Sequence, residues 1–145
     1  LARFGIGFTI LAPHQATAML EIGAEEWEDV SGGQIDPSRP YLCALPSGRT
    51  ITVFFYDAPI AKAVAFEGLL TKGEDFVTRL HTGFSDLRQW PQIVTIATDG
   101  ESYGHHHKFG DMALAYALND IENGEGVKLT NYGEYLDKNP PSMRY

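Results

Sequence analysis

The sequence predicts an α/β fold built on parallel strands, and three observations support this. Short apolar runs alternate along the chain with segments of helical spacing. The run Ile93–Ala97 is β-branched and apolar at consecutive positions, which is typical of a strand buried on both faces. Polar side chains follow three such runs, at His14, Asp57 and Asp99, as they do at the carboxyl ends of parallel strands. Three strand ends with polar residues on one face are explained by a (β/α) barrel of which only the later part is present. A doubly wound open sheet is the alternative.

Composition limits the class of protein. The 145 residues, 43% hydrophobic and 21% charged, suit one soluble globular unit. A net charge of −8 without a basic patch argues against a nucleic-acid partner, and no apolar run approaches the length of a membrane span. Cys43 is the only cysteine, which fits a cytoplasmic protein without disulfides. No glycine spacing fits a nucleotide-binding loop, so no cofactor is expected.

The first residues predict a fragment of a longer protein. Leu1–Gly5 has the pattern of the last turn of a helix closed by a C-cap glycine, yet neither the helix body nor an initiator methionine precedes it. We therefore expect residues 1–145 to be part of a single (β/α)-barrel domain.

Elements of the first half follow from apolar runs and turn signals. Phe8–Ala12 is expected to be a strand, and Ala16–Ile22 is compatible with the start of a helix. The acidic segment Glu25–Asp29 is expected to be a solvated excursion rather than a metal site. Tyr41–Leu45 and Arg49–Tyr56 flank a Pro-Ser-Gly turn and predict a hairpin.

Helices are expected in the second half. The first begins at Ala58–Pro59, and the second ends before Pro91. Their apolar positions lie at helical spacing: Ile60, Ala63, Val64, Phe66 and Leu70 in the first, and Phe76, Leu80, Phe84 and Leu87 in the second.

Two further helices are expected near the end. Asp111 is placed to cap the third, which Asn123–Gly124 ends, with an apolar stripe of Leu114, Ala115, Leu118 and Ile121. Asn131 and Glu134 form a capping-box pattern that begins the last helix before Pro140.

Asp99 and Glu101 are the candidate catalytic residues. Two carboxylates at a strand end suit glycoside hydrolysis, although these two are too close in sequence to be assumed to be the catalytic pair. The alternative is that they cap the next element or face solvent.

The run His105–His107 has two functional interpretations, a divalent metal site or hydrogen bonding to sugar hydroxyls, beside a purely structural loop. We expect no metal, because only one acid is locally available and no spaced histidine pair on a helix is present. The expected substrate-binding residues are His14, Gln15, Asp57, Tyr103, His105, His106 and His107.

Three stretches together resemble family 57 glycoside hydrolases, and more narrowly the α-amylase/α-mannosidase-like branch of that family. They are Phe8–Ala16, the segment Ile96–His106 with its Asp-Gly-Glu-x-x-Gly-His-His string, and Leu129–Leu136. The resemblance extends over nearly the whole chain. It implies a (β/α)7 barrel, here its later strands and helices only, that acts on α-glucan polysaccharides or oligosaccharides with retention of configuration.

The resemblance also implies site roles. Asp99 matches the general acid/base of the family, and Glu101 matches a supporting position in the same motif. The nucleophilic glutamate of the family lies on an earlier strand, so residues 1–145 are expected to lack it and to be inactive alone.

Three functions therefore stand at this stage. A retaining glycosidase or transglycosidase is favoured, a metal-dependent deacetylase-like hydrolase is the alternative, and an inactive carbohydrate-binding relative is the third. The first requires Asp99 to carry a proton when substrate binds, whereas the second requires it to be an ionised metal ligand.

Overall fold

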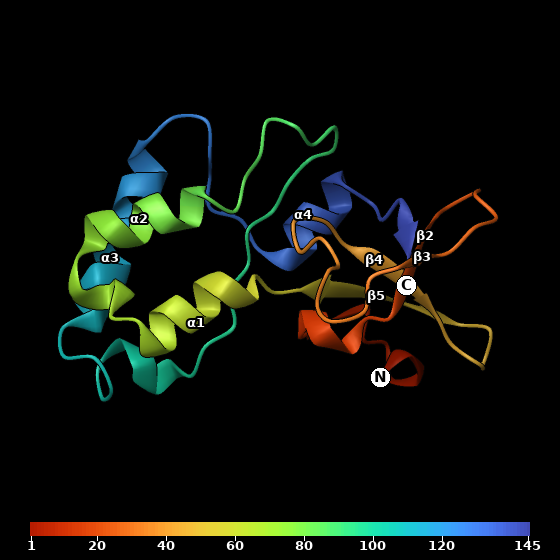
Figure 1. Ribbon diagram of the computed structural model, residues 1–145, viewed down its shortest axis with the longest axis horizontal. Helices are drawn as coiled ribbons and strands as arrows, with labels where there is room; N and C mark the ends of the chain where they lie inside the picture. The colour runs from red at the N-terminus through yellow and green to blue at the C-terminus, as the bar shows by residue number, and fades with distance from the viewer.

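A computed structural model describes all residues from Leu1 to Tyr145 and has the predicted α/β class (Figure 1). The strands are β1 (Phe8–Leu11), β2 (Ala18–Glu21), β3 (Glu28–Asp29), β4 (Tyr41–Ala44), β5 (Thr50–Phe55) and β6 (Met143–Arg144). The α-helices are α1 (Ala58–Phe66), α2 (Gly73–His81), α3 (Gly110–Asn123) and α4 (Tyr132–Lys138). Short 3-10 turns are η1 (Ala2–Phe4), η2 (Pro13–Gln15), η3 (Leu69–Thr71) and η4 (Gly100–Tyr103). None of the helices is long and apolar enough to cross a bilayer.

The sheet is mixed, with the strand order β1-β5-β4-β6-β2-β3. β1 and β5 are parallel neighbours, with Leu11 opposite Phe55, as the buried apolar runs predict. β4 and β5 form the predicted hairpin, with Tyr41 opposite Val53. β6 pairs parallel to β4 and antiparallel to β2, and it has no counterpart among the predicted strands.

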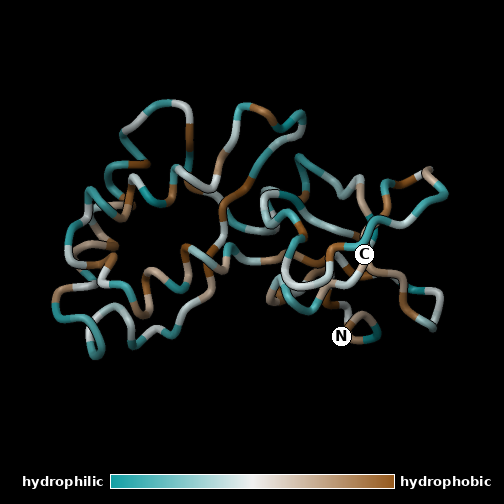
Figure 2. Tube along the Cα trace, in the orientation of Figure 1, coloured by the Kyte–Doolittle hydropathy of each residue, from teal (hydrophilic) through white to brown (hydrophobic).

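The molecule has a helical part and a sheet part. Helices α1, α2 and α3 pack together at one end, and the sheet with α4 forms the other (Figure 1). The extended segment Ile93–Ala97 runs between the two parts, and its hydrophobic residues appear as a brown stretch at their junction (Figure 2). This segment therefore lies at the centre of the molecule, as its apolar sequence predicts.

The prediction that Ile93–Ala97 is a strand is wrong, although the segment is extended and lies beside β5. Its hydrogen bonds are isolated rather than part of a ladder. Ile93 N–H donates to the Ser38 carbonyl at 2.9 Å, and Asp57 N–H donates to the Thr95 carbonyl at 2.8 Å. The expected burial on both faces is only partly met, since Ile93 is buried, the next three residues are half-buried and Ala97 is exposed.

Residues 16–22 do not begin a helix, because Ala18–Glu21 is strand β2. Its pairing partners, β3 and β6, come from later in the chain and override the weak local helical preference. The acidic segment Glu25–Asp29 is exposed throughout, as expected.

The second predicted helix is shorter than expected. α2 ends at His81, where Thr82 and Gly83 close its last turn, so Phe84 and Leu87 lie beyond it. Leu87 is 89% exposed and takes no part in the core. The steps of four, four and three residues from Phe76 to Leu87 match helical spacing, but the last two positions lie outside the helix.

The third helix differs from its prediction at its start and in its buried face. Asp111 lies inside the first turn, with Phe109 at the capping position, so it does not cap the helix. The buried residues are Gly110, Ala113 and Ala117 rather than the predicted stripe, and Leu118 is exposed. The predicted stop is correct, since the helix ends at Asn123.

The last helix begins as its capping signal predicts. The side chain of Asn131 accepts a hydrogen bond from Glu134 N–H at 2.9 Å, and the helix ends before Pro140. Lys138 and Thr130 hydrogen-bond the Glu134 carboxylate, and these contacts lower its pKa.

Aromatic packing joins α4 to the sheet. The Phe54 ring, fully buried in β5, lies 4.7 Å from the Tyr132 ring and 6.2 Å from the Tyr135 ring. The Tyr135 hydroxyl donates to the Pro91 carbonyl at 2.7 Å, and burial raises the pKa of this hydroxyl. The contact fixes the start of the extended segment that leads to Asp99.

Candidate active site

Two predicted site residues share one edge of the sheet. β1 and β5 run parallel with Leu11 opposite Phe55, and His14 and Asp57 follow these two strands within three residues. Both residues therefore lie beyond the same strand ends, as the sequence predicts.

Asp57 has a structural role at this edge. Its Oδ1 atom accepts a hydrogen bond from Ile60 N–H at 2.9 Å and so caps α1, while its own N–H donates to Thr95. Asp57 thus fixes the extended segment against the end of β5. Its carboxylate is already engaged by the helix, which leaves it less suited to the predicted substrate contact.

Asp99 is placed by this arrangement at the far end of the extended segment, at the N-cap of η4. Its carbonyl accepts a hydrogen bond from Ser102 N–H at 3.0 Å, whereas its side chain makes no capping hydrogen bond. The residue is exposed. The Asp99 side chain therefore does not cap the turn and faces solvent, where its carboxylate is accessible to a substrate.

An open hollow of about 460 Å³ surrounds Asp99 on the α1 side. Asp99 is the only carboxylate among the residues that line it: Tyr56, Ala58, Ala61, Lys62, Ala65, Phe66, Ala97, Thr98 and Asp99. The wall combines apolar and aromatic surface with a few polar groups, as binding sites for small molecules commonly do.

Tyr103 supports the loop that carries Asp99. Its hydroxyl lies 3.1 Å from Thr98 Oγ1, so a hydrogen bond spans the turn between the two residues. The Tyr103 ring packs against the cluster of buried side chains that joins α1, α2 and α3. This contact ties the Asp99 turn to the rigid helices rather than to substrate.

Glu101 and the three histidines His105–His107 do not share one set of contacts. Glu101 lies 3.3 Å from His106, and both side chains are largely exposed. His107 Nε2 lies 3.0 Å from the Ala65 carbonyl oxygen, so it ties the loop to the end of α1. His105 is exposed, with its ring 5.2 Å from that of His106. No group of three or more His, Cys, Asp or Glu side chains in the chain is arranged to hold a metal ion.

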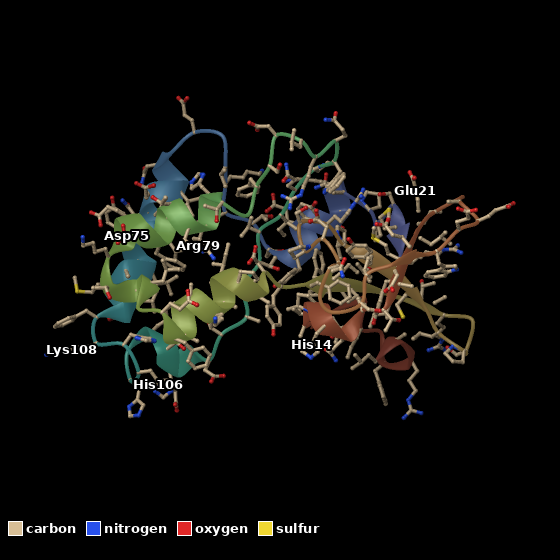
Figure 3. The ribbon with its side chains drawn as sticks, viewed as in Figure 1. His14, Glu21, Asp75, Arg79, His106 and Lys108 are labelled. Carbon is tan, nitrogen blue, oxygen red and sulfur yellow. The ribbon has the colours of Figure 1, made fainter.

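The structure does not bring all predicted substrate-binding residues together. His14 lies beside the sheet, whereas His106 lies at the remote end of the helical part (Figure 3). Gln15 accepts a hydrogen bond from Ala12 N–H at 2.9 Å and thereby caps the turn η2. A single sugar-binding cluster that contains His14 and the histidine run is therefore not formed within this chain.

Sequence reasoning missed three residues of the hollow, Tyr56, Lys62 and Phe66. Phe66 was expected on the buried face of α1, yet it is 82% exposed. Helical geometry carried the missing signal, since six residues at 3.6 per turn place Phe66 about 120° around the helix from buried Ile60.

A larger cavity of about 900 Å³ lies between α2, α3 and α4. It is lined mostly by hydrophobic side chains of these helices and of the extended segment, and it contains none of the predicted site residues. The hollow beside Asp99 is the smaller of the two, but it is the one that holds the candidate chemistry.

Comparison with known proteins gives the family and the fold of the chain. A family model described as glycosyl hydrolase family 57 matches residues 14–145. The crystal structure of a 4-alpha-glucanotransferase from Thermococcus litoralis is similar in fold, with a TM-score of 0.67 and 20% sequence identity over 97% of this chain. The chain spans 20% of the length of that enzyme. No curated protein matches the sequence.

The match to the solved structure bears out the predicted fold class, a partial (β/α) barrel with parallel strands. The family model covers all residues of the hollow and most of the sheet. The chain therefore belongs to glycosyl hydrolase family 57.

Proposed function

We propose that this chain supplies the general acid/base, Asp99, of a retaining glycoside hydrolase or transglycosidase that acts on α-glucans. The observation that supports this most strongly is the free carboxylate of Asp99 in an open hollow beside the end of β5. Family membership and the fold shared with a 4-alpha-glucanotransferase support the α-glucan substrate. The single cysteine, Cys43, supports a cytoplasmic location.

In this mechanism Asp99 acts twice. As an acid it gives its proton to the glycosidic oxygen while the bond between that oxygen and the anomeric carbon breaks. A second carboxylate forms a bond to the anomeric carbon in the same step. Asp99, now ionised, then takes a proton from water in hydrolysis, or from an acceptor sugar hydroxyl in transfer. The oxygen that loses this proton bonds to the anomeric carbon while the bond from that carbon to the second carboxylate breaks.

The second carboxylate does not come from the wall of the hollow. Asp99 is the only carboxylate there, and Glu101 is paired with His106. A retaining enzyme needs its nucleophile roughly 5–5.5 Å from the acid/base. We therefore propose that the nucleophile lies outside these residues and that the chain 1–145 alone has no glycosidase activity.

The stereochemical outcome tests the proposed reaction. Proton NMR of maltooligosaccharide cleavage by the complete gene product that contains this chain should show the α-anomer as the first product, because two displacements restore the original configuration. Treatment with a metal chelator should leave the rate unchanged. A β-anomer formed first would contradict the retaining mechanism, and loss of activity with recovery on adding zinc would favour the metal-dependent alternative.

Glu101 is expected to support catalysis without transferring the proton. Glu101→Ala should lower kcat/KM by less than about tenfold, because an exposed ion pair contributes only about 0.2–1 kcal/mol. The Glu101 carboxylate is two residues from Asp99 in the sequence, so its removal should displace one limb of the pH–rate profile. The matched variant His106→Gln leaves the Glu101 carboxylate in place without this partner, so any displacement should be in the opposite direction. A loss as large as that of Asp99→Ala would instead make Glu101 the proton donor.

A further inference from the structure

Phe66 occupies an unusual position for a large apolar side chain. It is the last residue of α1 and 82% exposed, although the neighbouring apolar residues Ile60 and Val64 of the same helix are buried. A singly exposed aromatic residue is common on protein surfaces and is not by itself a site. Phe66 differs because it lines the same hollow as the Asp99 carboxylate.

The other residues that line the hollow add small apolar and polar side chains to the aromatic ring of Phe66. Four of the residues that line it have small side chains, Ala58, Ala61, Ala65 and Ala97. Its polar groups come from Tyr56, Lys62 and Thr98. A pyranose ring has the same division, with apolar C–H faces and hydroxyl groups around its edge. An aromatic side chain packs against the C–H faces of the sugar, and hydrogen-bonding groups pair with its hydroxyl groups.

The end of α1 is held in place independently of a ligand. The Ala65 carbonyl lies 3.0 Å from His107 Nε2, and Lys62 forms an ion pair with Glu67 at 3.1 Å. The backbone that carries Phe66 is thus tied to the loop that follows Asp99. The aromatic side chain and the carboxylate both line this one hollow.

We propose that Phe66 is the apolar platform of a sugar-binding subsite next to Asp99, on which one pyranose ring of the glucan packs. The inference rests on the proposed function, since it assigns a residue to substrate recognition by the same site. Phe66 binds and orients substrate, and no proton passes through it.

The test compares Phe66→Ala with Phe66→Tyr in the complete gene product. Phe66→Ala should raise KM for maltoheptaose at least about tenfold, within the 10–200-fold range for a lost pocket contact, while kcat changes less. Phe66→Tyr, which keeps the ring, should restore KM. The melting temperature should stay unchanged in both, because the side chain is exposed.

Phe4→Ala is the matched control, since Phe4 is also exposed but lies in η1, outside the hollow. It should leave KM and kcat unchanged. An unchanged KM in Phe66→Ala, or a fall in melting temperature without a change in KM, would overturn the platform and make Phe66 a structural contact.

Binding of maltoheptaose to Asp99→Ala, measured by calorimetry, separates the two proposals. Retained binding in Asp99→Ala that is lost when Phe66→Ala is added supports both. Binding that survives both substitutions overturns the platform but keeps the proposed function. If the protein with Phe66 and Asp99 intact binds no maltoheptaose, the proposed function fails and the platform fails with it.

Discussion

Asp99→Ala is expected to lower kcat/KM for α-glucans by about 10²–10⁴-fold, the usual contribution of a positioned general acid. The sugar leaving group is a poor one and must receive a proton as its bond breaks. No other carboxylate lines the hollow to replace Asp99. Initial rates on maltooligosaccharides with the complete gene product would measure the loss.

Two variants serve as controls for this loss. Asp99→Asn keeps the size of the side chain but cannot donate a carboxyl proton, so it should lose nearly as much activity as Asp99→Ala. Asp111→Ala removes an exposed carboxylate from the first turn of α3 and should leave kcat/KM within about twofold. Equal losses in Asp99→Ala and Asp111→Ala would show that the effect is not specific to the hollow.

The largest loss of stability is expected for Phe54→Ala, at about 3–5 kcal/mol in the free energy of unfolding. Phe54 is 0% exposed and packs in β5 against the rings of Phe8, Tyr132 and Tyr135. Its removal leaves a cavity where α4 joins the sheet, and surrounding rings relax only in part. Urea denaturation followed by circular dichroism would measure the change.

Phe4→Ala is again the informative comparison, because the same atoms are removed from a side chain that is 72% exposed. It should change the free energy of unfolding by no more than about 0.5 kcal/mol. Similar values for the two variants would contradict the assignment of Phe54 to the junction between α4 and the sheet.

Elements with local signals were predictable from the sequence. The hairpin of β4 and β5 follows from two β-rich runs around a Pro-Ser-Gly turn, and its pairing is as expected. The Asn131 cap and the end of α3 at Asn123 are equally local, because each depends on residues within one helical turn.

Elements decided by distant partners were not predictable in the same way. β2 is a strand because β3 and β6 pair with it, and β6 lies at the other end of the chain. Ile93–Ala97 is extended and partly buried, but whether such a run enters a ladder depends on the neighbouring backbone, which its own sequence does not specify.

The candidate site also has one residue with a local sequence signal and others that depend on contacts between distant elements. Asp99 is a candidate from the sequence because an apolar run ends there in a polar, glycine-rich segment, and in the structure its side chain makes no capping hydrogen bond. The rest of the lining was not predictable, because residues of α1 such as Phe66 share the hollow with Asp99 only through the packing of elements distant in sequence. The histidine run is a conspicuous motif in the sequence, yet His106 contacts Glu101 and His107 contacts the Ala65 carbonyl.

Leaving-group dependence tests the assignment of Asp99 most directly. The ratio of kcat/KM for an activated aryl glucoside to that for a maltooligosaccharide should rise by about 10²-fold or more in Asp99→Ala, because the aryl group departs without a proton and only the sugar leaving group needs one. Equal losses on the two substrates would contradict the role of Asp99 as the general acid, and full activity on both would return it to the role of a loop residue.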